Sequence, residues 1–331
     1  MIETRAPDGL KNEPLVSVVV FTYNSEKYVI ETLESVKAQT YQNIELVISD
    51  DCSSDETCIL CNKWIDKNGS FFNGIKLITY PRNTGIVFNL NRGLKAASGE
   101  WIKIIAGDDL LLEQSIHKYV QFVSSNVCNV VAAKRYYFYN NDPDQRRSKD
   151  DHNIFNQKGI SNKEQYQIAL RGFGAPHNTW FFRKKFIEAI GYYDEKFPMM
   201  EDWSMKIRVL NSGEKIYFCD QYTLLYRVHQ DSVSLLKEGK IYSGWYMNAM
   251  KPVKEQLILP YLPWDERLMM KYDFWIAQIF YGSILNKYNL FNRTIKYLLR
   301  VPVEIGKHYF TKRLMKSVSD RISKSKLTDN F

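Results

Sequence analysis

The chain has 331 residues and a formal net charge of +8, with 45% hydrophobic and 25% charged residues. This length allows one large or two modest domains, and the composition is that of a folded globular protein, which excludes intrinsic disorder for most of the chain. Residues 1–13 lack the apolar stretch of a signal peptide, and no later run reaches the roughly 20 apolar residues of a membrane span, so we expect a cytoplasmic protein that is soluble or peripheral.

Apolar β-branched runs and helical stretches alternate through the first hundred residues. The runs at 15–22, 44–48, 75–79 and 101–105 have the pattern of buried strands, and the stretches at about 26–39, 54–66 and 86–97 have that of helices. This alternation predicts a doubly wound parallel sheet, whose ligands bind beyond the carboxyl ends of the strands. The sequence has neither a GxGxxG motif after the first run nor a GxxxxGK(S/T) motif, so it lacks the usual NAD fingerprint and the P-loop.

Beyond these elements the pattern mixes strands and helices. Residues 129–139 predict a further strand, the polar stretch 140–156 predicts a mobile loop of the length that often covers a site, and a short helix is expected after Asp202. Residues beyond about 240 are predicted to be helical and aromatic. The expected fold class is therefore α/β, a Rossmann-like doubly wound mixed sheet with a C-terminal helical segment.

Polar side chains follow each of the first four predicted strands. The strands run into Thr22-Tyr23-Asn24, Asp50-Asp51, Arg82-Asn83 and Gly107-Asp108-Asp109. These acids and amides should gather at the ligand-binding edge of the sheet. Asp108 and Asp109 place two carboxylates at one exposed turn, where their oxygens could hold a divalent cation together with substrate phosphates. The alternative is that this pair only caps a following helix.

Six motifs occur in the order and spacing of glycosyltransferase family 2, which the chain resembles. They lie at residues 16–24, 49–55, 83–85, 91–93, 97–100 and 107–109. The resemblance is strong over about residues 14–125 and weaker at 191–208 and 226–234. It implies a GT-A fold, a nucleotide-sugar donor and, as is usual in the family, inversion at the anomeric carbon.

The resemblance also implies a division of the chain. An N-terminal extension (1–13) would precede a GT-A catalytic domain (14–239), and a basic, aromatic, helical region (240–331) would follow it. Within the catalytic domain, residues 14–125 would form the nucleotide-sugar half and residues 126–239 the acceptor half.

The matched motifs imply a donor site at the strand ends. Thr22, Tyr23 and Asn24 match the loop that wraps the base and ribose in this family, and either Asp50 or Asp51 would accept a hydrogen bond from the base. The alternative for this acidic pair is a loop or the cap of the next helix. The donor-binding residues that we expect are Thr22, Tyr23, Asn24, Asp50, Asp51, Asn83, Gly107, Asp108, Asp109 and Arg227.

The metal site implied by the resemblance depends on Asp108, which matches the last acid of the family's DxD motif. The first acid of that motif would fall at Ala106, so the chain departs from the family there. Asp109 and His229, together with the donor's phosphates, are the further ligands expected for Mn²⁺ or Mg²⁺. Leu90 stands where many members carry an arginine that contacts phosphate.

Glu201 and Asp202 match the acidic motif that carries the family's catalytic base. Inverting transfer needs a carboxylate to take the proton of the acceptor hydroxyl, and we expect Asp202 in this role with Glu201 as the second candidate. Asp202 could instead only cap the following helix. His177, Trp180 and Trp203 are candidates for lining the acceptor cleft, with ordinary packing as the alternative for the first two.

The positive charge lies in the C-terminal segment. Residues 267–326 contain 13 Lys and Arg against 3 acids, a net charge of +10, which leaves 32 basic and 34 acidic residues, or −2, for the rest of the chain. Aromatic and aliphatic residues are interleaved with these charges, which fits helices lying on an anionic membrane surface. The alternative is a helical domain packed on the rest of the chain with a solvated basic face. This uneven distribution argues against a nucleic-acid partner.

These observations predict an inverting, metal-dependent glycosyltransferase. We expect a UDP-hexose or UDP-N-acetylhexosamine donor and a saccharide acceptor, lipid-linked and with undecaprenyl as the candidate carrier. The expected setting is bacterial cell-surface polysaccharide synthesis of the O-antigen or capsule type, at the inner face of the cell membrane. The alternatives are a sugar-1-phosphate nucleotidyltransferase and a non-catalytic basic protein that binds membrane or nucleic acid.

Overall fold

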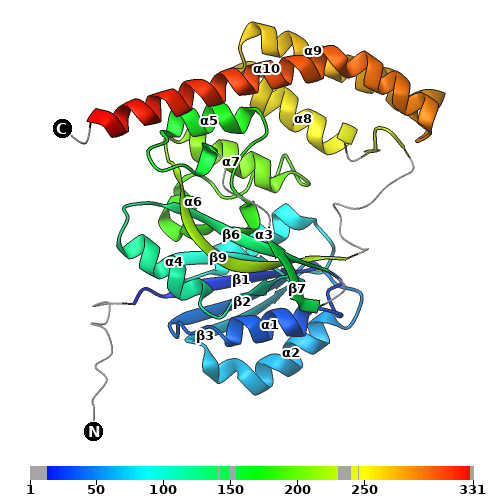
Figure 1. The fold of residues 1–331 in the computed structure, drawn as a ribbon. Helices are drawn as coiled ribbons and strands as arrows, with labels where there is room; N and C mark the ends of the chain where they lie inside the picture. Colours follow the sequence, from blue (N-terminus) through cyan, green and yellow to red (C-terminus); the bar gives the residue numbers. More distant parts are fainter. Residues whose placement is uncertain (1–12, 140–141, 149–153, 230–239, 245, 329–331) are drawn as a thin grey trace.

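The computed structural model describes residues 13–139, 142–148, 154–229, 240–244 and 246–328. The N-terminal extension expected at 1–13 falls outside the described residues except for its last position. Helices cover both faces of one sheet, and a further layer of helices lies over one of these faces (Figure 1).

The first half of the sheet is parallel, as predicted. β1 (Val16–Thr22) carries the β-branched side chains typical of a strand buried on both faces. It pairs with β2 (Ile44–Asp50) on one side and with β4 (Trp101–Ala106) on the other, and β2 pairs with β3 (Gly74–Thr79). The carboxyl ends of these four strands therefore lie along one edge.

The second half of the sheet is mixed. β8 (Phe181–Arg183) is antiparallel to β4 and to β6 (Val130–Tyr139), and β6 is parallel to β9 (Ile216–Val228). β5 (Leu110–Leu111) is antiparallel to β9. Among the described residues the order is β3-β2-β1-β4-β8-β6-β9-β5, with β7 (Asp142–Ser148) paired to β6 outside this path.

The polar stretch predicted as a mobile loop contains β7, so that prediction was wrong for residues 142–148. β7 is antiparallel to β6. The guanidinium groups of Arg146 and Arg147 lie 5.0 and 5.7 Å from the ring centroids of Tyr136 and Tyr139 on β6. Such cation–aromatic contacts stabilise the pairing without an alternation of apolar side chains, which is why the hydrophobic pattern did not reveal the strand.

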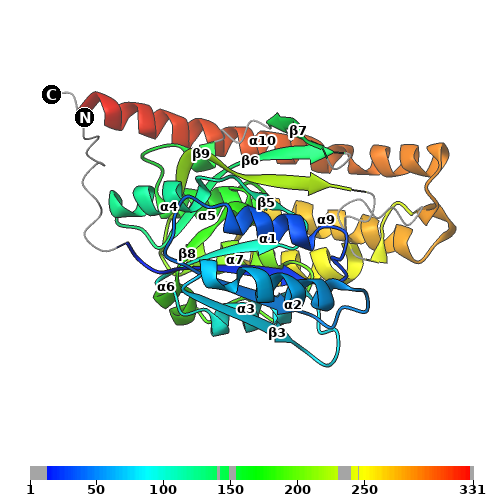
Figure 2. The same ribbon diagram turned by 90° about the horizontal axis from the view of Figure 1, so that it is seen from below.

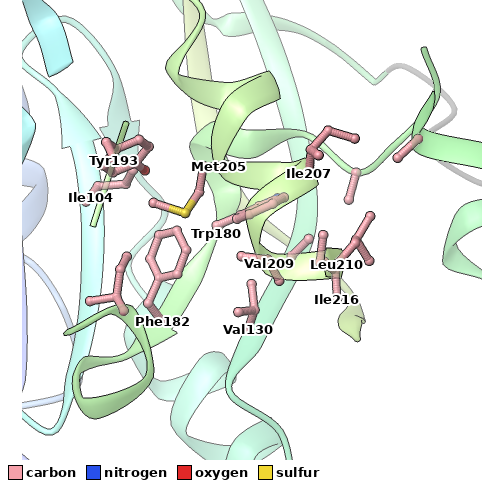
Figure 3. Close-up of a cluster of buried hydrophobic side chains, with 14 of the residues drawn as sticks. Ile104, Val130, Trp180, Phe182, Tyr193, Met205, Ile207, Val209, Leu210 and Ile216 are labelled. Atoms are coloured by element: carbon pink, nitrogen blue, oxygen red, sulfur yellow. The ribbon is translucent and has the colours of Figure 1, made fainter. Parts of the chain in front are cut away.

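The helices divide between the two faces of the sheet, each with its own buried cluster (Figures 1 and 2). One face is covered by α1 (Val29–Lys37), α2 (Thr57–Asn68) and α4 (Ser115–Ser124). The other is covered by α3 (Ile86–Ala96), α5 (Asn162–Leu170), α6 (Lys184–Ala189) and α7 (Glu201–Asn211). Figure 3 shows the second cluster, in which Trp180 and Phe182 of the β8 segment lie beside Met205 and Val209 of α7.

The C-terminal region is helical, as predicted, and packs on the layer formed by α5 and α7 (Figure 1). It contains α8 (Lys251–Val253), α9 (Trp264–Tyr281) and α10 (Leu290–Thr328). Val318 and Ile322 of α10 are buried in the same cluster as the apolar face of α7. In the described part of the chain, no helix combines the length and the apolar character required to cross a membrane.

Candidate active site

The polar strand ends meet because β1 has a parallel neighbour on each side. In the register of the sheet, Thr22 lies beside Asp50 and Phe21 lies beside Ala106. The turn after β4 comes so close to β1 that a Cβ atom on Gly107 would lie 2.8 Å from Cγ2 of Thr22. This close approach requires glycine at position 107, and it joins the ends of β1, β2 and β4 into one site.

Asp51 is buried, and its carboxylate is fully hydrogen-bonded within the protein. It accepts hydrogen bonds of 2.5–2.9 Å from the backbone N–H groups of Thr84 and Gly85, the Thr84 hydroxyl and the Arg92 guanidinium. Burial alone would raise the pKa of Asp51, but these hydrogen bonds outweigh it and the pKa is lowered. Four hydrogen bonds fill the acceptor positions of a carboxylate, so Asp51 holds the loop between β3 and α3.

Asp50 is held by a weaker set of donors than Asp51. Its buried carboxylate accepts hydrogen bonds from the Thr22 hydroxyl at 2.8 Å and from the Ser53 backbone and hydroxyl at 2.8 and 2.5 Å. Its further partner is the thiol of Cys58, which is only a weak donor that a ligand could replace. Within the acidic pair, Asp50 is therefore the residue that could still accept a hydrogen bond from a ligand.

Asn24 and Tyr23 lie in the loop that follows β1. Asn24 has a positive φ of 49°, and its side-chain oxygen accepts a hydrogen bond of 2.9 Å from the Ser54 backbone. The Tyr23 side chain is half exposed. The loop after β1 is thus held by Asn24, while the ring of Tyr23 is left accessible to a ligand.

A pocket of about 500 Å³ opens beside Asp51, on the loop after β3 and the outer side of α3. Its lining is basic and aromatic, and consists of Tyr80, Arg82, Asn83, Thr84, Phe88, Asn91, Arg92, Lys95 and Glu195. Arg92 was not among the expected site residues, although it lies in the motif at residues 91–93. Its guanidinium lies 4.5 Å from the ring centroid of Tyr80 and binds Asp51, so it fixes one wall of this pocket.

Asp108 and His229 face each other, whereas Asp109 does not join them. Oδ2 of Asp108 lies 3.1 Å from Nε2 of His229. Asp109 is only 2% exposed, in contrast to the expected exposed turn, and its carboxylate accepts a hydrogen bond of 3.0 Å from the backbone of Arg227. Burial raises the pKa of Asp109 to about 8.

This geometry could provide two ligands for a divalent cation. Asp108 offers an oxygen and His229 a ring nitrogen, both partly accessible. The described residues contain no group of three or more His, Cys, Asp or Glu side chains suited to hold an ion. A cation here would therefore need further oxygens from a bound molecule, such as a diphosphate.

The Arg227 side chain is fully buried and braces the turn that carries these acids. Its Nε donates a hydrogen bond of 2.7 Å to the Asp108 carbonyl, and one terminal nitrogen lies 2.6 Å from the Glu31 carboxylate on α1. The guanidinium also lies 4.6 Å from the ring centroids of both Tyr28 and Phe138. Sequence analysis placed Arg227 among the donor-binding residues, but its guanidinium is enclosed by these groups and positions the turn instead.

Glu201 and Asp202 form the first turn of α7. Oδ1 of Asp202 accepts a hydrogen bond of 2.7 Å from the backbone of Trp203. Burial, and next the negative charge of Asp202, raise the pKa of Glu201 to about 7. Glu201 therefore keeps its proton to a higher pH than an exposed glutamate does.

The three candidates for the acceptor cleft have different surroundings. Trp180 is completely buried in the hydrophobic cluster, so its side chain packs in the core and does not line a cleft. His177 lies 3.0 Å from the Tyr193 hydroxyl, and burial lowers its pKa to about 3, so it is neutral. Trp203 is half-buried beside Gly172 and remains next to the acid pair.

Tyr193 connects this region to α3. Its backbone N–H and carbonyl bond the Asn91 side chain, each at 3.0 Å. Burial, and next the negative charges of Glu201 and Asp202, raise the pKa of the Tyr193 hydroxyl. Through Asn91, the segment between α6 and α7 is therefore tied to α3.

Known proteins share sequence with this chain. A family model described as glycosyl transferase family 2 matches residues 17–191. Glycosyltransferase GlyG of Streptococcus pneumoniae serotype 4 is 33% identical over 128 residues, which is 39% of this chain and 41% of GlyG. The minor teichoic acid biosynthesis protein GgaB of Bacillus subtilis is 25% identical over 252 residues, which is 73% of this chain and 26% of GgaB. The chain thus spans less than half the length of either relative.

A solved structure shares the fold. The crystal structure of S. aureus TarS 1–349 in complex with UDP-GlcNAc has a TM-score of 0.59 and 19% sequence identity, and the match covers 91% of this chain and 81% of that one. At this identity the likeness concerns the fold alone.

We expect Arg227→Met to lower the stability of the protein. The substitution removes the donor to the Asp108 carbonyl and to Glu31 but leaves the backbone N–H that binds Asp109. Hydrogen bonds to charged groups contribute about 1.5–3 kcal/mol each, so thermal denaturation should show a loss of that order. In the control Arg183→Met, which removes an exposed ion pair with Glu100, the loss should stay below about 1 kcal/mol. Equal stability of the two variants would contradict a bracing role.

Proposed function

The chain belongs to glycosyltransferase family 2, and on this premise we propose that it transfers a hexose or N-acetylhexosamine, with inversion, from its UDP conjugate to a saccharide acceptor. The observation that carries the proposal is the meeting of three features at the strand ends. These are the carboxylate of Asp50, the exposed ring of Tyr23 and the facing pair of Asp108 and His229. The acid pair that matches the family's base motif lies at the start of α7.

The donor would lie across the ends of β1, β2 and β4. Asp50 would accept a hydrogen bond from the base in place of the Cys58 thiol, which is a weak donor, and Tyr23 would contact the base or ribose. The basic lining of the neighbouring pocket, with Arg82, Arg92 and Lys95, would attract an anionic donor. The TarS complex with UDP-GlcNAc, which has the same fold, supports a uridine nucleotide.

Asp108 and His229 would hold a Mn²⁺ or Mg²⁺ ion against the donor diphosphate. Such an ion supplies positive charge that stabilises the diphosphate as it leaves. Asp109, expected as a further ligand, would serve instead to fix the backbone of β9 beside His229. The chain's own contribution is to orient the two ligands and, through Arg227, the turn that carries Asp108.

Asp202 would remove the proton of the acceptor hydroxyl as its oxygen attacks the anomeric carbon. Glu201 is the second candidate for this role, since burial raises its pKa to about 7 and a pKa near the operating pH also suits a general base. Trp203, next to Asp202, remains the candidate among the three aromatic residues for contact with the acceptor sugar.

We propose that the acceptor is linked to a lipid carrier such as undecaprenyl. The protein would bind this acceptor at the inner face of the cell membrane, during synthesis of a surface polysaccharide. The name of the relative GgaB, a teichoic acid biosynthesis protein, supports a cell-surface polymer. On α10, Leu298, Ile305 and Tyr309 are 57–65% exposed and recur at helical spacing, followed by the exposed Lys312 and Lys316. A basic helix with an unpartnered apolar stripe fits an anionic bilayer, to which each Lys or Arg contributes about 1 kcal/mol.

Asp202→Asn should abolish most of the transfer activity while leaving donor binding intact. The amide is nearly isosteric but does not accept the proton, and loss of a general base lowers kcat by about 10²–10⁴-fold. UDP release from a panel of UDP-sugars with saccharide acceptors measures kcat, and calorimetry with UDP measures binding. Glu201→Gln, which reproduces the protonated side chain, should retain activity within about tenfold of the native level. The roles would be reversed if Glu201→Gln were the inactive variant.

Asp108→Ala and His229→Ala should each weaken Mn²⁺ binding in the presence of UDP by at least about tenfold. Calorimetric titration of UDP-saturated protein with Mn²⁺ tests this. Asp109→Asn is the matched control, because its amide oxygen still accepts the Arg227 N–H. It should bind Mn²⁺ almost as the native protein does, and a loss of affinity as large as that of Asp108→Ala would assign Asp109 to the metal.

Leu298→Glu and Ile305→Glu should each reduce binding to phosphatidylglycerol vesicles by about tenfold, because a charge would replace an apolar contact. Co-sedimentation of the full chain at low and high salt, with phosphatidylcholine vesicles for comparison, measures this. Ile59→Glu is the control, since Ile59 is 52% exposed on α2, far from the C-terminal helices (Figure 1). Equal binding of all three variants, or no preference of the native protein for anionic vesicles, argues against the membrane proposal.

A further inference from the structure

Lys206 is a buried ammonium group on the helix that carries the acid pair. It lies four residues after Asp202 on α7, and residues at this spacing share one face of a helix. The side chain is 8% exposed. Among the residues that the structure describes, none forms a hydrogen bond or an ion pair with it. Since an isolated buried charge is costly, proteins rarely bury lysine without a partner.

The loop before β8 is shaped to leave room for this ammonium. A Cβ atom on Gly174 would lie 2.6 Å from Nζ of Lys206 and 2.7 Å from its Cε, so the head of the side chain rests on the backbone of this glycine. Nζ also lies 5.7 Å from the ring centroid of Trp203. The ammonium is thus held between a glycine and an aromatic ring, and neither neutralises its charge.

The charged groups around Lys206 do not balance it. Asp202 favours the ammonium, but it is too distant for an ion pair and is the proposed base. Lys103 and Lys206 both act on His177, whose pKa they lower further after burial. Lys103 donates a hydrogen bond to the Asn178 carbonyl at 2.6 Å, whereas no described residue accepts one from Lys206. Burial lowers the pKa of Lys206.

Lys206 remains reachable by a ligand. The side chain is 8% exposed. Its Nζ atom has no hydrogen-bond partner among the described residues, but it is not one of their fully buried unpartnered polar atoms, so part of its surface is accessible. An anion that entered beside Asp202 would replace lost hydration with a charge-assisted hydrogen bond. A neutral sugar would not offer this compensation.

We propose that Lys206 binds an anionic group, a carboxylate or a phosphate, carried by the acceptor saccharide next to the hydroxyl that Asp202 deprotonates. This inference rests on the proposed function, because it takes Asp202 as the base. It adds the chemical class of the acceptor, an acidic saccharide. Lys206 would act as a specificity-determining residue, since its buried charge favours an acidic acceptor and penalises a neutral one of the same shape.

The test compares matched probes on the UDP-saturated protein. Methyl glucuronide and methyl glucoside 6-phosphate carry the anion, and methyl glucoside is their neutral counterpart. Affinities from NMR titration should favour at least one anionic probe by about tenfold or more, as expected for one charge-assisted hydrogen bond. Preference for the first probe alone identifies a carboxylate, and preference for the second alone identifies a phosphate.

Two variants assign the preference to the Lys206 ammonium. Lys206→Met keeps the length of the side chain without its charge. Gly174→Ala keeps the charge but places a methyl group 2.6 Å from the present position of Nζ, so the flexible Lys206 side chain has to move its ammonium away without unfolding the protein. Both should lose the preference for the anionic probe. Lys163→Met, on the exposed side of α5, is the control and should retain it.

The results separate this inference from the proposed function. Calorimetry with UDP on each variant reports the donor site independently, and unchanged UDP affinity with a lost anion preference supports the inference. If the native protein does not distinguish the probes, or if the preference survives in Lys206→Met, the inference is overturned even where UDP binding and transfer are intact. A loss of UDP affinity in Lys206→Met without a change in probe preference would overturn it too, by assigning the ammonium to the donor.

Discussion

The candidate site depends on one constraint, the parallel pairing of β1 with a strand on each side. Parallel strands end at the same edge, so the polar residues after β1, β2 and β4 meet without any long loop. β8, the next strand along, is antiparallel and ends this arrangement. Four acids, Asp50, Asp51, Asp108 and Asp109, therefore lie at a short stretch of one edge, and the protein has to stabilise several carboxyl groups there.

Each acid at this edge is compensated in its own way. Asp51 is saturated by backbone N–H groups and Arg92, and Asp50 is bound by hydroxyl and backbone donors and by the weakly donating Cys58 thiol. Asp109 is buried, with a raised pKa, and accepts a backbone N–H. Asp108 alone is left facing a histidine. Burial thus separates acids that hold the structure from those that can bind a ligand, although they are adjacent in sequence.

Local sequence pattern predicted the elements whose residues carry their own signal. The first four strands are short apolar runs, and α1 buries Val29, Leu33 and Val36 at helical spacing. β7 could not be found in this way, because arginine–tyrosine contacts replace apolar alternation there. The first four strands and α1 carry an apolar pattern in their own residues, whereas the contacts that stabilise β7 are made with side chains of another strand.

Roles set by contacts across the chain were also hidden. Asp109 is buried because it meets Arg227 on β9, which follows it by more than a hundred residues. Trp180 sits in the core because α7 covers it, and no feature of its neighbours in sequence indicates that. The motifs located the acids correctly at the strand ends, but only the packing distinguishes a ligand-binding carboxylate from a structural one.

The buried cluster on the α7 side of the sheet also contains Ile258, Leu262, Val318 and Ile322 from the C-terminal region. The two regions that the sequence-based division separates at residue 240 therefore share one hydrophobic core. In evolutionary terms the helical region is not a module that recombination could exchange freely between relatives. A new C-terminal segment would have to match the apolar surface of α5 and α7, so substitutions on the two sides of this contact would have to change together.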